Sequence, residues 1–165
     1  MASAVELLPK EYGYVVLAVV LYTFLNFCMA AKVGRARKRY KVPYPTMYAS
    51  ESENKDAKVF NCVQRGHQNS LEMMPMLFVL LMLGGLKHPC ISAALGFLFT
   101  FTRYFYFKGY ATGDPINRLA IGYICHSYFR IVVCRREKWR KYGFLAIFGL
   151  IGCTISFGVS LLLRG

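Results

Sequence analysis

Charged residues are scarce in this sequence. They make up 18% of its 165 residues, against about 25% in soluble domains, whereas hydrophobic residues reach 56%. Four windows contain no charge at all. Two of them, residues 12–31 and 143–163, are 20 and 21 residues long, which is enough to cross a hydrocarbon core of about 30 Å. This pattern excludes a disordered chain and a water-soluble globule, and it predicts an all-α integral membrane protein.

Acidic residues, metal-binding patterns and nucleic-acid motifs are also missing or few. The chain has 21 Lys and Arg but only eight Asp and Glu, yet its basic residues flank the apolar windows instead of covering one face of a domain. We therefore expect no nucleic-acid partner. The six cysteines show no Cys-x-x-Cys or Cys/His spacing, so neither a disulfide framework nor a metal site is expected. The first apolar stretch is too long for a signal peptide and should remain as a helix.

The two middle windows, residues 73–86 and 89–102, are only 14 residues each and reach about 21 Å as helices. To span a membrane, each must include neighbouring polar residues. We therefore predict a single membrane domain, residues 1–165, with four transmembrane helices in a bundle. Their expected ranges are about 10–34, 58–86, 89–110 and 142–163, with residues 123–140 as an atypical inserted segment.

The polar extensions of the middle helices are patterned. Arg65, Asn69 and Glu72 fall at i, i+4 and i+7 and share an arc of about 60°. Arg103, Tyr106 and Tyr110 form a similar stripe, and in an antiparallel pair the two stripes meet at one membrane face. Ionisable groups at membrane depth are costly unless paired or hydrated, so they indicate a functional cavity. A simple neutralising pair of Arg65 and Glu72 is the alternative.

The distribution of Lys and Arg predicts the orientation. Residues 32–70 and 103–142 contain nine each, whereas the remaining segments contain only Lys10, Lys87 and Arg164. The polar face is therefore expected in the cytosol. Arginines, a carboxylate, an amide and tyrosine hydroxyls suit a small zwitterion with more than one carboxylate, such as glutathione, although a peptide or an acidic phospholipid headgroup would also fit.

Three stretches resemble a known family. Residues 60–72 (FNCVQRGHQNSLE) with Pro75, residues 36–45 (ARKRYKVPYP) and residues 103–110 (RYFYFKGY) are similar to the MAPEG family of membrane-associated eicosanoid and glutathione proteins. Within it they resemble the plant-like form of the microsomal glutathione S-transferase 3 branch. The resemblance implies a four-helix subunit, a homotrimer, and glutathione held between subunits near the cytosolic face.

The resemblance also implies roles for individual residues. Glu72 would bind the γ-glutamyl ammonium and Arg65 a carboxylate, and Arg118 would stabilise the thiolate. Lys38, which is next to Arg37 and on the same membrane face, is the rival candidate for that last role on position alone. The implied glutathione-binding residues are Arg37, Arg65, Asn69, Glu72, Tyr106 and Tyr110. Met73 stands where most relatives have a tyrosine.

The function that the resemblance implies is that of a membrane glutathione transferase and peroxidase. It would use glutathione as co-substrate, with no other cofactor, on lipophilic electrophiles or lipid hydroperoxides, in the endoplasmic reticulum membrane with its active site facing the cytosol. The alternative is a non-catalytic MAPEG-type protein that binds and presents lipid. Residues 123–140 depart from the family pattern and are either an amphipathic interfacial piece or a gene-model error.

Overall fold

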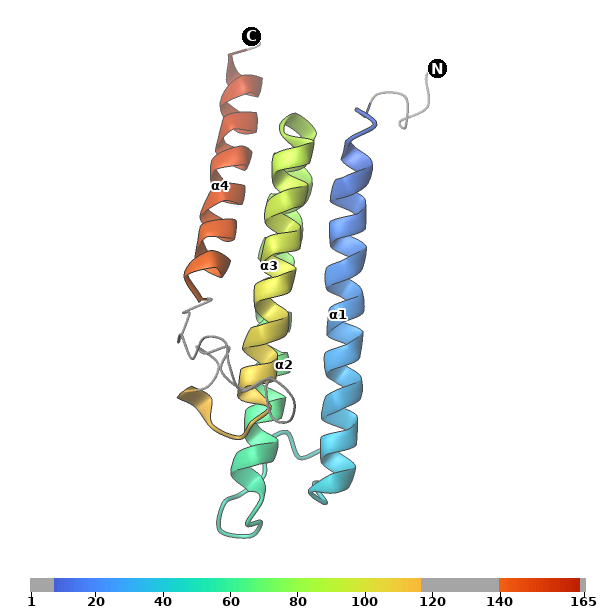
Figure 1. Cartoon of the computed structure of the whole chain (residues 1–165), viewed down its shortest axis with the longest axis vertical. Coiled ribbons are helices and arrows are strands. Elements are labelled where there is room, and N and C mark those ends of the chain that lie inside the picture. The colour runs from blue at the N-terminus through green and yellow to red at the C-terminus, as the bar shows by residue number, and fades with distance from the viewer. Residues whose placement is uncertain (1–7, 117–139, 164–165) are drawn as a thin grey trace, which may run out of the picture. The chain divides into compact units, whose positions relative to one another are not determined.

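The computed structural model of the chain describes residues 8–116 and 140–163. All regular structure in these residues is helical, which confirms the predicted all-α fold class (Figure 1). The helices are α1 (Tyr12–Arg39), α2 (Ala57–Lys87), α3 (Pro89–Tyr110) and α4 (Arg140–Leu162). Each is long and apolar enough to span a membrane.

The first helix continues five residues beyond its expected end at residue 34, and the reason lies in its C-cap. Lys41 adopts a left-handed conformation with φ of 55°, and the N–H of Val42 donates to the carbonyl of Arg37 at 3.0 Å. This is the Schellman arrangement, which closes a helix and buries an apolar residue just after it. The last turn contains three basic residues, Arg37, Lys38 and Arg39. Positive charges there interact favourably with the negative C-terminal end of the helix dipole, so these residues stabilise the last turn and do not terminate the helix.

The starts of α2 and α3 follow ordinary capping rules. Asp56 precedes α2 and its carbonyl accepts bonds from Val59 and Phe60, as expected for an N-cap residue. Only His88 separates α2 from α3, which begins with Pro89 at a position where proline loses no helical hydrogen bond. The expected ranges leave two residues between these helices, and the structure leaves one, because α2 continues through Lys87.

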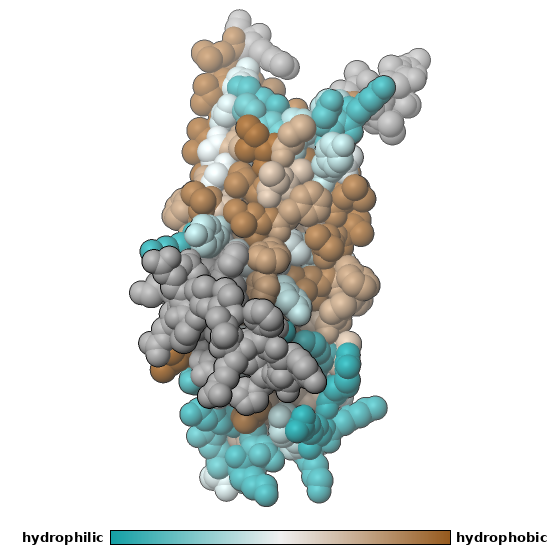
Figure 2. Space-filling view, in the orientation of Figure 1, coloured by the Kyte–Doolittle hydropathy of each residue, from teal (hydrophilic) through white to brown (hydrophobic). Residues whose placement is uncertain are grey.

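The described chain packs as two compact units, and α1, α2 and α3 contribute residues to both. The first unit contains residues 8–24, 73–101 and 142–163. Its core includes Tyr22, Leu77, Phe99 and Leu150, one residue from each helix. Figure 2 shows apolar side chains over the outer surfaces of α1 and α4, as expected for helices that face lipid.

Hydrogen bonds between helices and close packing at a glycine stabilise the first unit. Lys87 donates to the carbonyl of Ser156 at 3.0 Å, and the ring of His88 bonds the Ser156 hydroxyl at the same distance. A Cβ built on Gly96 would lie 2.9 Å from the end of the Leu81 side chain, so a larger residue here would displace Leu81 or separate α2 from α3. Lipid tails are as apolar as the helix surfaces, so the hydrophobic effect does not drive helices together inside a membrane. Close packing and interhelical hydrogen bonds of this kind drive their association instead.

The second unit contains residues 25–72, 102–116 and 140–141 among those described. Its core joins the last part of α1, the first part of α2 and the end of α3. The buried side chains are Met29, Val33, Ala36, Val42, Phe60, Val63 and Phe107. This unit carries the candidate site, because it brings the polar extensions of α2 and α3 together.

Candidate functional site

The predicted stripe on α2 forms a connected group of side chains. Arg65 Nη1 lies 2.7 Å from Glu72 Oε1, and Asn69 Nδ2 donates to Glu72 Oε2 at 3.4 Å. The side chains of Arg65 and Glu72 are 43% and 46% exposed. Helical spacing of seven residues places Arg65 and Glu72 two turns apart on one face, which long side chains can bridge. A cation, an amide and a carboxylate therefore share one accessible surface.

The stripe on α3 continues this group. Arg103 Nη1 donates to Asn69 Oδ1 at 2.6 Å, and the Arg103 guanidinium lies 4.9 Å from the Tyr106 ring centroid. The rings of Tyr106 and Tyr110 meet edge to face at 5.2 Å. The two stripes therefore meet through Arg103 and Asn69, as their spacings predict. Asn69 uses its donor toward Glu72 and its acceptor toward Arg103, so it links the two charges.

Gly66 allows this meeting. A Cβ at residue 66 would lie 3.1 Å from both the Phe107 ring and the Tyr110 Cβ, which is closer than most real Cβ contacts. Gly66 is buried next to Arg65 on α2. Without a side chain, it lets α3 approach α2 closely enough for Arg103 to reach Asn69.

Arg37 has a different setting from the α2 group. It is 8% exposed, and its Nη1 donates to the carbonyl of Thr46 at 2.6 Å. The guanidinium lies 4.5 Å from the centroid of the Tyr44 ring and 5.2 Å from that of Phe60. These contacts tie the loop after α1 to the helices. Lys38, the next residue, is exposed in the last turn of α1.

The structure adds one residue to the predicted set and does not describe another. Arg103 belongs to the predicted α3 stripe but was not assigned to glutathione, although its spacing from Tyr106 and Tyr110 was the available signal. Arg118 and residues 123–139 of the segment 123–140 lie outside the described residues, whereas Arg140 begins α4.

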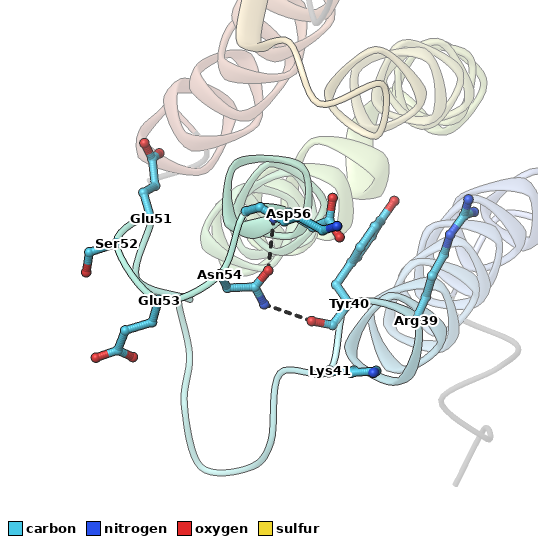
Figure 3. Close-up of a pocket in the computed structure, with 9 residues that line it drawn as sticks. Arg39, Tyr40, Lys41, Glu51, Ser52, Glu53, Asn54 and Asp56 are labelled. Carbon is cyan, nitrogen blue, oxygen red and sulfur yellow. Dashed lines mark hydrogen bonds between the residues drawn. The ribbon is translucent and has the colours of Figure 1, made fainter.

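A second polar feature lies where α1 ends and α2 begins. It is a cavity of about 730 Å³ lined by three basic and three acidic side chains together with Tyr40, Ser52 and Asn54 (Figure 3). Asn54 closes the loop because its Nδ2 donates to the Tyr40 carbonyl at 2.8 Å and its Oδ1 accepts from the Asp56 N–H at 2.9 Å. None of the seven predicted site residues within the described ranges lines it. In those ranges no group of His, Cys, Asp or Glu is placed to hold a metal.

Comparison with known proteins identifies the family. The sequence pattern that defines the MAPEG family matches residues 15–128. The chain belongs to the MAPEG family. The matched region includes α1 from residue 15 onward, all of α2 and α3, and the joined polar stripes, and it extends six residues into the segment 123–140.

Among MAPEG relatives, three mammalian microsomal glutathione S-transferase 2 proteins are similar to this chain. The mouse (Mus musculus) protein is 36% identical over 83 residues, and the cattle (Bos taurus) and human (Homo sapiens) proteins are 32% identical over the same length. Each alignment covers 50% of this chain and 52% of the relative. The chain thus spans about half the length of the curated relatives that it matches.

Proposed function

We propose that this MAPEG protein is a membrane glutathione S-transferase of the type 3 branch. The observation that carries the proposal is the continuous group formed by Arg65, Glu72, Asn69 and Arg103. Glutathione has one ammonium and two carboxylates, and this group offers one carboxylate and two guanidiniums. The names of the mammalian relatives support the same substrate.

Binding follows from charge matching. Glu72 accepts hydrogen bonds from the γ-glutamyl ammonium, and the guanidinium of Arg65 pairs with a glutathione carboxylate. In the structure these two side chains neutralise each other at 2.7 Å. When a zwitterionic ligand binds, its ammonium pairs with Glu72 and its carboxylate with Arg65. Each side chain therefore exchanges one charged partner for another. Asn69, Arg103, Tyr106 and Tyr110 supply further donors on the same surface.

The reactive form of glutathione is its thiolate. A cysteine-type thiol has a pKa of about 8.5, and a cation within about 4–6 Å lowers the pKa by stabilising the charged form. Arg118 is the proposed cation, with Lys38 as its rival and Tyr106 or Tyr110 as a hydrogen-bond donor to sulfur. In transfer, the thiolate forms a C–S bond while the leaving group departs with its electron pair. In the peroxidase reaction, two glutathiones are oxidised to the disulfide while a hydroperoxide becomes an alcohol and water.

The exposure of the site supports assembly with a neighbouring subunit, and the assembly that we propose is a homotrimer. Arg65 and Glu72 are nearly half exposed on a membrane-spanning helix, and charged groups facing lipid are costly. A neighbouring subunit that covers this face would remove that cost and would complete the pocket. The excess of Lys and Arg in residues 32–70 and 103–142 supports a cytosolic site, and the endoplasmic reticulum is the proposed membrane.

Calorimetric titration of glutathione into the purified protein tests the binding site. Arg65→Ala and Glu72→Gln are each expected to weaken binding by about 1.5–3 kcal/mol, or roughly 10- to 150-fold, because each removes a charge-assisted hydrogen bond. Glu53→Gln is the matched control, because Glu53 is an exposed carboxylate in the loop before α2. Unchanged affinity in both site variants would contradict the proposed site.

Turnover distinguishes an enzyme from a lipid-presenting relative. The protein is expected to conjugate glutathione to 1-chloro-2,4-dinitrobenzene and to reduce a fatty-acid hydroperoxide, and Glu72→Gln should lower both rates. If the protein retains fatty acids on purification but turns over neither substrate, the lipid-presenting alternative holds.

A further inference from the structure

The exposed side of α1 becomes basic where the helix leaves its charge-free window. Four exposed residues follow one another on this side at i, i+4, i+7 and i+11, namely Cys28, Lys32, Arg35 and Arg39. At 100° per residue they lie within an arc of about 60°. Cys28 belongs to the charge-free window 12–31, and the other three are cations. This order matches one bilayer leaflet, in which acyl chains end at phosphate groups.

The end of α3 carries another cation on an exposed side. Lys108 lies four residues, about one turn, after Tyr104, whose side chain is 40% exposed. The Lys108 ammonium lies 5.9 Å from the centroid of the Tyr104 ring, within the range of a cation–π contact. Tyrosine is enriched at the headgroup level of membranes, because its ring is apolar and its hydroxyl is polar. The pair therefore indicates that Lys108 lies near the phosphate layer.

Lys32 connects the two cationic positions. Its Nζ lies 5.6 Å from the centroid of the Phe107 ring, and Phe107 is the residue before Lys108. Val33, next to Lys32, shares a buried core with Phe107, and α1 and α3 lie side by side (Figure 1). The cations of the two helices therefore lie at the same depth along the bundle.

The described residues supply no counter-charge for these cations. Residues 12–50 and 73–113 contain no Asp or Glu. In the part of the chain that the structure describes, no carboxylate forms an ion pair with Lys32, Arg35 or Lys108. Cations at the membrane surface that have no protein carboxylate are stabilised by anionic lipid headgroups. The partner that fits this surface is therefore an external anion.

We propose that the basic ends of α1 and α3 bind an anionic phospholipid. Lys32 and Lys108 bind its phosphate from the two helices, and its acyl chains extend into the bilayer beside the charge-free window of α1. Arg35 supplies a further cation, and its Nε donates to the Ala31 carbonyl at 3.4 Å, so the side chain bends back toward the bilayer. None of these residues belongs to the proposed glutathione site, so the two proposals stand or fall separately.

Lipid affinity of the full-length protein in detergent tests the proposal. Native mass spectrometry measures the binding of phosphatidylglycerol, which is anionic, and of phosphatidylcholine, which has no net charge. We expect the wild-type protein to bind phosphatidylglycerol at least about fivefold more tightly. Lys32→Gln and Lys108→Gln should each weaken that binding about fivefold, the usual contribution of one cation at an anionic membrane surface. Lys32→Arg should retain it, because the charge is kept.

The matched control is Lys58→Gln, because Lys58 is an exposed lysine in the first turn of α2. It should change the affinity for phosphatidylglycerol by less than about twofold. If Lys32→Gln does not fold, because it also loses the contact with the Phe107 ring, Arg35→Gln provides the same test. Arg35 is bonded only within its own helix among the described contacts, and its loss should weaken phosphatidylglycerol binding to a similar extent.

Three results would overturn the inference. Equal binding of the two lipids by the wild-type protein, or an equal loss in Lys58→Gln, would show that no defined site exists. Displacement of the lipid by glycerol 3-phosphate at the same concentration would show that the surface binds a soluble anion. A change in the number of subunits without a change in lipid affinity would show that a second copy of the chain covers this surface.

Discussion

At the scale of single residues, two arginines predicted for the same ligand have different surroundings. Arg65 is nearly half exposed and pairs with Glu72, so its guanidinium can exchange that partner for a ligand. Arg37 is buried, bonded to the Thr46 carbonyl and placed against two aromatic rings. A residue with these contacts stabilises the loop whether or not it also binds glutathione.

The first prediction concerns Arg37. Arg37→Ala removes a charged hydrogen bond and two ring contacts, and we expect it to destabilise the protein by about 2 kcal/mol. Arg37→Lys should recover part of the loss, because it keeps the charge but not the planar stacking. Thermal unfolding in detergent measures both. A wild-type midpoint for Arg37→Ala, combined with lost glutathione affinity, would show that Arg37 acts only on the ligand.

The second prediction concerns the thiolate. Because a nearby cation lowers the pKa of a thiol, Arg118→Ala should raise the pKa of bound glutathione toward about 8.5. Turnover should fall at neutral pH and partly recover at alkaline pH, where the thiol ionises unaided. Thiolate absorbance of bound glutathione against pH is the measurement. Identical titration curves in both proteins would move the role to Lys38 or a tyrosine.

At the scale of helices, the site depends on how closely α2 and α3 approach. Gly66 has no Cβ where one would lie 3.1 Å from two α3 residues. The contact between Arg103 and Asn69 is short, 2.6 Å, so it tolerates little separation. The backbone spacing is therefore part of the site, even though Gly66 has no side chain.

The third prediction tests this spacing. Gly66→Val should push α3 away from α2, lowering the unfolding midpoint and weakening glutathione binding by 10-fold or more, which corresponds to about 1.4 kcal/mol. Gly152→Val is the control, because a Cβ at residue 152 meets nothing within 4 Å. Equal effects of the two variants would show that the α2–α3 approach is not what Gly66 provides.

At the scale of the whole chain, the charge distribution and the number of helices predict the orientation in the membrane. Eighteen of the 21 Lys and Arg fall in residues 32–70 and 103–142. If all four helices span the membrane, both segments lie on the same side, and the positive-inside rule predicts that this side faces the cytosol.

The fourth prediction tests this orientation. The native Cys90 is exposed at the start of α3, so a cysteine-free protein with Cys90 restored reports on the α2–α3 junction. We expect an impermeant maleimide added to sealed microsomes to leave Cys90 unlabelled until detergent is added. Ser50→Cys in the same background should be labelled at once. The opposite result would place the site on the lumenal side.

Sequence periodicity alone identified most of the candidate site. A helix repeats every 3.6 residues, so the spacings of Arg65, Asn69 and Glu72 and of Arg103, Tyr106 and Tyr110 already placed each set on one face. The scarcity of charge likewise predicted four apolar helices, which the structure confirms. These inferences succeed because bilayer thickness and helix geometry act locally along the chain.

Only the tertiary structure decided which side chains meet. Hydrogen bonds join Tyr48 to Gln68 and Arg37 to Thr46. No helical pattern links these pairs, because one member of each pair lies in a loop whose path depends on distant contacts. The end of α1 could likewise not be predicted from the sequence. Lys41 takes the left-handed conformation that closes the helix, and this position is usually marked by a glycine. Residues far apart in the chain come together through packing, and packing is decided by all the helices of a unit at once.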